Sequence, residues 1–306
     1  MKVFITGSTG LLGSTLLRQA PSHIELGASY NVNKLVPNVS CRYFYADITR
    51  KNLIAKAFSS FKPDVVIHTA AIATPDYCDK HKEEAYRVNV VGTKNIIKEC
   101  RKNNVVLVYI TTNGVYDGEY PPYDESIKPK PIDFYGKTKY QSEKLVMQSK
   151  VPYIIIRLIT MYGWNNPFER QNPVTWLLEI LGRNKTPINM VTDMFCNFLF
   201  VEEASKAIWK SILSKQWGES FNIAGKNCQS RFDFTREIAK VFGLDQRMIY
   251  PVTLNFFKYF VPRPKNTCFI TNKMEKVLKI KPINTTKGLR HMKNNPISEA
   301  FWKEIR

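Results

Sequence analysis

Residues Lys2 to Gly13 read KVFITGSTGLLG, and this stretch decides the fold. Lys2–Thr6 is predicted to be a short β-strand, and the leucines after Gly10 begin a helical pattern. Glycines at positions 7, 10 and 13, between a strand and a helix, favour a turn whose backbone can approach a pyrophosphate. The helix N-terminus adds free N–H groups and a positive dipole end, so this turn is expected to bind such an anion.

The composition indicates a large α/β protein. A chain of 306 residues that is 44% hydrophobic can bury a large core, as one unit or as a domain with a smaller lobe. There is no run of about 18 apolar residues, so we expect no transmembrane helix. There is also no charged leader followed by an apolar segment, so we expect no signal peptide and a cytoplasmic protein.

The cysteines carry no recognisable pattern. They form no C-x-x-C pair and no zinc-like spacing with the four histidines. We therefore expect no metal site, and reduced thiols at all six positions, which are Cys41, Cys78, Cys100, Cys196, Cys228 and Cys268.

The chain is strongly basic, with a formal net charge of +19 and a pI near 9.6. Such a charge suits nucleic-acid binding, but the lysines recur throughout and form no block of five or six like charges. We interpret the charge as spread over helix surfaces and do not expect a nucleic-acid partner. A basic field would also favour an anionic nucleotide substrate.

The first half of the chain alternates strands and helices. Strands are expected at Lys2–Thr6, Ile24–Tyr30, Arg42–Ala46, Val65–Thr69, Val105–Thr111 and Tyr153–Leu158. Helices are expected at Leu11–Ala20, Lys51–Ser59, Glu83–Asn103 and Tyr140–Ser149, the last starting near Gly136. This alternation predicts a Rossmann-like, doubly wound parallel sheet covered on both faces.

The second half is less regular and predicts a smaller C-terminal substrate-binding lobe. Strands are expected at Phe198–Val201 and Ser220–Ile223, and helices at Asn172–Gly182, Glu202–Ser214, Phe232–Phe242, Thr271–Leu278 and Ile297–Ile305. We expect residues 1–160 to form the nucleotide-binding domain, segments within about 190–225 to return to it, and residues 161–306 to form mainly the lobe.

A second motif is Tyr135-Gly-Lys-Thr-Lys139. A tyrosine and a lysine four residues apart lie on the same helix face. A nearby ammonium group favours the phenolate and would lower a tyrosine pKa that is ordinarily near 10. The motif follows a strand that ends in Thr111-Thr112, which indicates a proton-transfer site. His68, inside an apolar strand, is expected to be a hydrogen-bonded core residue.

Taken together, these motifs resemble the extended short-chain dehydrogenase/reductase family, and within it the dTDP-4-dehydrorhamnose reductases and related nucleotide-sugar reductases. The resemblance covers nearly the whole chain. It lies in the glycine turn, Asn89-Val-Val-Gly92-Thr93, Thr111 to Gly118, Pro122-Tyr-Asp-Glu125, Pro131 to Lys139, Arg157 to Gly163, and Arg263-Pro-Lys-Asn-Thr267.

The resemblance implies a catalytic triad of Thr112, Tyr135 and Lys139, with hydride passing between a nicotinamide cofactor and C4 of the sugar. Thr112 would hydrogen-bond the reacting oxygen, Tyr135 would transfer the proton, and Lys139 would also hold the nicotinamide ribose. Substrate would contact Thr112, Asn113 and Arg263. Cofactor would contact Tyr135, Lys139 and a further set comprising Gly7, Thr9, Gly10, Leu11, Leu12, Gly13, Asp47, Ile48, Ala70, Ala71 and Asn89.

The cofactor is expected to be NADP(H), with NAD(H) as the alternative. A carboxylate at the end of the second strand would bind the ribose 2′-OH of NAD, but Ser29 to Lys34 contains none. Lys34 could meet a 2′-phosphate instead. The partner implied by the resemblance is a nucleotide-sugar substrate, and a homodimer is a family-level expectation.

Other functions stay open at this point. Asn113-Gly114 departs from the reductase pattern and lacks the acidic pair typical of 4,6-dehydratases. A nucleotide-sugar 4-epimerase that retains bound NAD is one alternative. A non-catalytic regulatory subunit, similar to the β subunit of methionine adenosyltransferase, is another.

Overall fold

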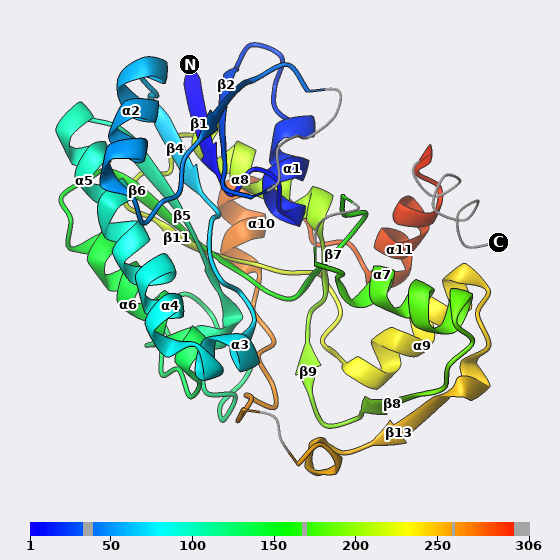
Figure 1. Ribbon diagram of the computed structural model, residues 1–306. Helices are drawn as coiled ribbons and strands as arrows, with labels where there is room; N and C mark the ends of the chain where they lie inside the picture. Colours follow the sequence, from blue (N-terminus) through cyan, green and yellow to red (C-terminus); the bar gives the residue numbers. More distant parts are fainter. Residues whose placement is uncertain (33–38, 167–169, 259–260, 297–306) are drawn as a thin grey trace.

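The computed structural model describes residues 1–32, 39–166, 170–258 and 261–296. Seven parallel strands form the central sheet in the order β11-β6-β5-β4-β1-β2-β3 (Figure 1). The predicted doubly wound parallel sheet is therefore confirmed. Its strands are β1 (Lys2–Thr6), β2 (Glu25–Tyr30), β3 (Arg42–Tyr45), β4 (Val65–His68), β5 (Val106–Thr112), β6 (Tyr153–Leu158) and β11 (Ser220–Ile223).

Helices cover both faces of the sheet (Figure 1). One face carries α2 (Lys51–Phe61), α5 (Thr93–Asn103) and α6 (Phe134–Met147), with the short helices α3 (Pro75–Lys80) and α4 (Lys82–Tyr86) beside them. The other face carries α1 (Leu11–Arg18), α8 (Val201–Leu213) and α10 (Asn272–Leu278).

Strand β1 shows why the central strands are apolar throughout. Val3, Phe4 and Ile5 are all completely buried. Successive side chains point to opposite faces, so Val3 and Ile5 join the core beneath α1 and α8, while Phe4 joins the core beneath α2. The ring of Phe4 lies 5.9 Å from those of Phe58 and Phe61, centroid to centroid.

The long helix predicted at Glu83–Asn103 is present but is not uniform. Between α4 and α5 lies a π-helical segment, η1 (Arg87–Gly92). Buried Asn89 in this segment accepts a hydrogen bond from the N–H of Ile72 (2.9 Å) and donates to Thr138 Oγ1 (3.0 Å). The π segment therefore joins the loop after β4 to α6, in keeping with the frequent occurrence of such segments near functional sites.

The later part of the chain forms a smaller lobe beside the sheet (Figure 1). It contains three strand pairs, β7 (Met161–Tyr162) with β10 (Leu199–Phe200), β9 (Phe195–Cys196) with β12 (Gln229–Ser230), and β8 (Ile188–Val191) with β13 (Ile249–Val252). Its helices are α7 (Pro173–Leu177), η3 (Leu178–Arg183), α9 (Arg231–Phe242) and α11 (Thr285–Lys293). Two short 3₁₀ turns, η4 (Gln246–Met248) and η5 (Leu254–Phe256), also lie in this part of the chain, whereas η2 (Asn113–Val115) directly follows β5 of the sheet.

The chain returns to the sheet between the elements of the lobe. After β10, helix α8 packs on α1, and β11 then adds to the sheet beside β6. Trp209 on α8 donates from Nε1 to the carbonyl of Leu16 on α1 (3.1 Å). Lobe and sheet also share one continuous apolar core, so the two parts are packed as a unit.

The structure corrects several element boundaries. The helix expected to start near Gly136 begins at Phe134, because Asp133 caps it by accepting the N–H of Gly136 (2.7 Å). The strand expected at Phe198–Val201 is reduced to the two residues of β10. No strands were predicted at β7, β8, β9, β12 and β13, because strands of two to four residues are too short to show a clear alternation. The helix predicted at Ile297–Ile305 lies outside the described residues.

The cysteine prediction is wrong for two of the six residues. Cys228 and Cys268 form a disulfide across 40 residues of sequence. Cys41, Cys78, Cys100 and Cys196 are free thiols, as expected. Pairing was not visible in the sequence because the two segments meet only through the tertiary fold.

Two expected absences can be examined over the described ranges. Within them, no helix has the length and apolar character needed to cross a bilayer. Nor do these residues bring together three or more His, Cys, Asp or Glu side chains in a group able to hold a metal ion.

We expect a stability gain from glycine at the end of α2. Lys62 caps this helix in the left-handed region, with φ 53° and ψ 66°. That conformation costs an L-residue other than glycine about 1 kcal/mol. Lys62→Gly should therefore raise the free energy of unfolding by about 0.5–1 kcal/mol in urea titrations. Lys56→Gly, in the exposed interior of the same helix, should lower it by about 1 kcal/mol. Destabilisation by both changes would contradict the argument.

Candidate functional site

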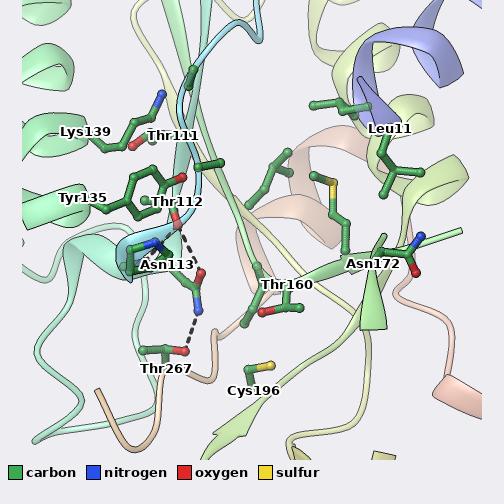
Figure 2. A pocket seen from close by; sticks show the side chains of 18 of the residues that line it. Leu11, Thr111, Thr112, Asn113, Tyr135, Lys139, Thr160, Asn172, Cys196 and Thr267 are labelled. Carbon is green, nitrogen blue, oxygen red and sulfur yellow. Dashed lines mark hydrogen bonds between the residues drawn. The ribbon is translucent and has the colours of Figure 1, made fainter. Parts of the chain in front are cut away.

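A cavity of about 470 Å³ lies where the sheet meets the lobe. Its sheet side is formed by residues that follow the carboxyl ends of β1, β4, β5 and β6, the edge at which open parallel sheets bind ligands. Its other side is formed by late segments of the chain, including Asn172, Cys196 and Thr267 (Figure 2).

The glycine turn forms one wall of this cavity, through Gly7, Gly10, Leu11, Leu12 and Gly13. Gly7 has φ +64°, and a Cβ there would lie 2.8 Å from the backbone of Ala70. Only glycine lets the turn pack this closely against the loop after β4. Helix α1 starts at Gly10 with no side-chain cap and no acidic residue in its first turn. Its first N–H groups therefore suit an anionic group such as a pyrophosphate.

Thr112, Tyr135 and Lys139 lie together on the opposite side of the cavity (Figure 2). Thr112 ends β5, while Tyr135 and Lys139 lie one turn apart on α6. Helix α6 approaches so closely that a Cβ at Gly136 would overlap the carbonyl oxygen of Gly114. The glycine after Tyr135 thus allows this helix to bring the tyrosine against the end of β5.

Helix α6 is fixed to the sheet by a buried ion pair. Glu143, one turn beyond Lys139, is completely buried and accepts hydrogen bonds from the guanidinium of Arg157 on β6. Arg157 also donates from Nη1 to the hydroxyl of Tyr116 (2.9 Å). Because both charges are out of water, this pair holds α6 in one position on the sheet.

Lys139 is buried, and its surroundings favour the uncharged amine over the ammonium form. Its Nζ donates to the carbonyl of Ile110 (2.8 Å) and lies 4.4 Å from the ring centroid of Tyr109. Burial lowers the pKa of Lys139 to about 7, and the nearby carboxylate of Glu143 opposes this shift. Lys139 therefore titrates near neutral pH.

The pKa of Tyr135 differs from the expectation. Burial raises it above its ordinary value, and the hydrogen bond with Thr112 opposes this only in part. The predicted depression by Lys139 is not found: desolvation of the phenol dominates, and the charge that opposes it is that of Arg170. Tyr135 is thus a protonated phenol at neutral pH.

His68 is the core residue that the sequence predicted. Its ring nitrogens lie 2.7 Å from Thr6 Oγ1 and 3.1 Å from Thr93 Oγ1. Burial lowers the pKa of His68 to about 3, with a smaller contribution from Lys139. The imidazole is therefore neutral and packs within the sheet.

The two remaining substrate candidates connect the sheet to the lobe. Asn113 donates from Nδ2 to Thr267 Oγ1 (2.6 Å), and its Oδ1 accepts from Thr112 (3.3 Å), as Figure 2 shows. Arg263 forms an ion pair with Asp76 at the start of α3 and also lines the cavity. Both side chains are thus at the cavity, but Arg263 already has a carboxylate partner.

Two further arginines at the cavity were not anticipated. Arg170 and Arg231 line it together with Arg263. Burial lowers the pKa of Arg231, and the two neighbouring guanidinium groups contribute. No sequence motif marks these residues, because they come from the irregular second half. We call the part of the cavity lining formed by these three arginines the arginine wall. Its three guanidinium groups are suited to bind a phosphate-bearing ligand.

A second cavity of about 360 Å³ adjoins the first through Arg170, Asn172 and Arg231. Polar and apolar residues contribute equally to its lining. We call it the aromatic cavity because its apolar residues, which are Pro173, Trp176, Met190, Phe198 and Phe234, include three aromatic rings. The sequence did not predict this cavity, because its walls come from segments that are far apart along the chain.

Five predicted cofactor residues do not line the main cavity, namely Thr9, Asp47, Ile48, Ala70 and Asn89. Asp47 Oδ1 accepts the N–H and the hydroxyl of Thr49 (both 2.8 Å). Ile48 is buried, and Asn89 is used within the protein, as described above. Ala71 does line the cavity. Lys34, invoked for cofactor choice, lies outside the described residues.

Comparison with known proteins agrees with this architecture. The family model described as "RmlD substrate binding domain" matches residues 1–296. The chain is 25% identical to methionine adenosyltransferase 2 subunit beta of Bos taurus, over 82% of this chain and 75% of the relative. It is 25% identical to the probable low-salt glycan biosynthesis reductase Agl14 of Haloferax volcanii, over 90% of this chain and 91% of the relative.

Solved structures show the same fold. The dTDP-4-dehydrorhamnose reductase of Bacillus anthracis, solved in complex with NADP, superposes with a TM-score of 0.82 at 25% identity. The match covers 95% of this chain and 98% of the reductase. The similarity therefore extends over both the sheet and the lobe.

The buried Lys139 should leave a pH signature in stability. Its pKa is lowered from 10.5 to about 7, so between these values the unfolded chain binds more protons than the folded protein. The free energy of unfolding should therefore rise with pH above 7, by up to about 1.4 kcal/mol per pH unit. Urea titrations from pH 7 to 9 should show this rise in the wild type and in Lys137→Met, an exposed control on the same helix. Lys139→Met should lose it. An unchanged slope in Lys139→Met would contradict the prediction.

Proposed function

Because the chain belongs to the RmlD substrate binding domain family, we propose that it is a nicotinamide-dependent reductase of a nucleotide-activated 4-keto-6-deoxysugar. One observation carries the proposal. Thr112, Tyr135 and Lys139 face a cavity that is also lined by the glycine turn and by three arginines. This is the arrangement that a dinucleotide and an anionic sugar nucleotide would need in order to meet at a proton donor.

The glycine turn and Lys139 would hold the cofactor, and bound NADPH would supply a hydride to the sugar C4. Tyr135 would donate its proton to the developing C4 oxygen. Burial raises its pKa, so the phenol carries that proton at neutral pH and needs a nearby positive charge to release it. Thr112 would hydrogen-bond the same oxygen. Lys139 would place a positive charge beside Tyr135 as the proton leaves, and so stabilise the phenolate.

The arginines support a nucleotide sugar over a free sugar. One guanidinium group can bind two phosphate oxygens at once. Three guanidinium groups line the main cavity, and two of them, Arg170 and Arg231, also line the aromatic cavity. In this proposal the diphosphate contacts Arg231 and Arg170, while Trp176 and Phe234 pack against the base. Arg263 joins them if the diphosphate displaces Asp76.

NADP(H) is the proposed cofactor. Ser29 and Tyr30, at the end of β2, offer no carboxylate to repel a 2′-phosphate. The similar reductase of Bacillus anthracis was solved with NADP. NAD(H) remains the alternative, and direct titration of both reduced cofactors by fluorescence separates the two.

A second candidate is a non-catalytic subunit. It is favoured by the similarity to the β subunit of methionine adenosyltransferase over most of the chain. Such a protein would bind NADPH, would not oxidise it with any nucleotide sugar, and would co-purify with a synthetase subunit.

A 4-epimerase would instead retain NAD through purification and interconvert sugars without net oxidation.

Removal of the phenolic hydroxyl should separate chemistry from binding. Tyr135→Phe should lower kcat for NADPH oxidation with a dTDP-4-keto-6-deoxysugar by about 100-fold or more, because the proton donor is lost. The Kd for NADPH should stay within about twofold of the wild type, since the ring is retained. Wild-type turnover in this variant would exclude the proposed mechanism.

Loss of Arg231 should act on substrate binding. Arg231→Ala should raise KM for the nucleotide sugar about tenfold or more, because a charge-assisted contact to the diphosphate is removed. NADPH binding should not change. Arg236→Ala, which removes an exposed arginine from the same helix, is the matched control and should behave as the wild type. An unchanged KM in Arg231→Ala would count against a diphosphate at this wall.

A further inference from the structure

We propose that Cys228 and Cys268 form a thiol–disulfide exchange site that reacts with a dithiol and adjusts the substrate wall of the cavity. The two sulfurs are bonded in the structure. Their surroundings differ, since Cys228 is exposed and Cys268 is only 2% exposed. The effect on catalysis rests on the proposed function, whereas the exchange chemistry does not.

The difference in exposure defines the order of the reaction. A thiolate of the dithiol can reach the sulfur of Cys228, form a bond to it and break the bond to Cys268. Cys268 leaves as a thiolate and takes up a proton. The second thiol of the reagent then attacks the mixed disulfide and frees Cys228. Two electrons and two protons pass from the dithiol to the cysteine pair, and the reagent becomes a disulfide.

The disulfide spans a three-segment layer centred on β9. On one side, β12 pairs with β9 in antiparallel register. On the other side, Phe195 of β9 donates its N–H to the carbonyl of Lys265 (2.7 Å) and accepts the N–H of Thr267 (3.1 Å). Cys228 directly precedes β12, and Cys268 directly follows Thr267. The covalent bond thus joins the two outer segments of the layer.

Both outer segments carry a residue of the cavity wall. Arg231 follows Cys228 by three positions and donates its backbone N–H to the carbonyl of Met194 (2.9 Å). Thr267, next to Cys268, accepts the hydrogen bond from Asn113, which itself adjoins Thr112. The disulfide therefore restrains the positions of Arg231 and Thr267 relative to each other and to the triad.

Reduction should loosen this wall without unfolding the lobe. The segment around Cys268 keeps other bonds, because Phe269 donates its N–H to Asn197 Oδ1 (2.7 Å) and Tyr123 donates its N–H to the carbonyl of Cys268 (2.8 Å). A cross-link removes chain freedom that these hydrogen bonds alone do not remove. The glycine turn belongs to a different wall of the cavity, so cofactor binding should be unaffected.

The site of attack is tested by trapping. Full-length protein is treated with limiting glutathione, alkylated, and mapped by mass spectrometry. We expect the glutathione adduct on Cys228 and the alkylated thiol on Cys268. A glutathione adduct found only on Cys268 would overturn the proposal. So would the absence of a Cys228–Cys268 disulfide after the protein has been incubated with oxidised glutathione. This readout does not depend on any enzymatic activity.

The consequence is tested by comparing oxidised and dithiothreitol-reduced protein. Reduction should raise KM for the nucleotide sugar at least threefold and leave the Kd for NADPH unchanged. The double variant Cys228→Ser/Cys268→Ser should show the higher KM with or without dithiothreitol. Cys41→Ser, which removes a partly exposed free thiol, should still respond to reduction. An equal KM in the oxidised and reduced proteins would overturn the proposal that the disulfide adjusts the substrate wall of the cavity.

A binding measurement separates this inference from the proposed function. If no sugar is turned over, the affinity for dTDP is measured by calorimetry in both redox states. Weaker dTDP binding after reduction would support the exchange site even though the proposed reductase activity had failed. Equal dTDP binding in the two states would overturn the inference.

Discussion

The buried pair of Arg157 and Glu143 is the interaction on which the site depends. It attaches α6 to β6, and α6 carries both Tyr135 and Lys139. Loss of one member would leave a buried charge without a partner, at a cost of about 3–5 kcal/mol. The pair is also linked to the later part of the chain. Arg157 contacts Tyr116, whose ring stacks on that of Tyr123 at 4.3 Å between centroids, and Tyr123 donates its N–H to the carbonyl of Cys268 (2.8 Å). One ion pair thus connects α6 to the sheet and, through the two tyrosines, to the segment around Cys268.

Burial has a different effect on each ionisable group of the site. It keeps Tyr135 protonated, brings Lys139 to titrate near neutrality and makes His68 a neutral core residue. These shifts share one cause, which is the loss of water around groups buried between the sheet and α6 or within the sheet. A tyrosine that holds its proton and a lysine that can lose one form a pair suited to proton transfer. The positive charge of Arg170 favours the phenolate of Tyr135 and so opposes the effect of burial.

Two motifs could be predicted from the sequence for a physical reason. The glycine turn and the Tyr135–Lys139 spacing are local patterns, in which chain geometry alone places the residues together. The pKa of Tyr135 was not readable, because it depends on desolvation by distant segments and not on the lysine one turn away. The long helix at Glu83–Asn103 was recognised, but its π segment depends on Asn89 contacting residues from two other elements.

The sequence by itself determined the alternation of strands and helices, the glycine turn and the Tyr135–Lys139 spacing, because each is a pattern among near neighbours in the chain. The parallel sheet could then be inferred from the alternation. Only the tertiary structure decided the arginine wall, the aromatic cavity and the Cys228–Cys268 bond. These features join segments separated by tens of residues that carry no periodic pattern. Their positions follow from how the lobe packs against the sheet, which is a property of the whole core and not of any one stretch.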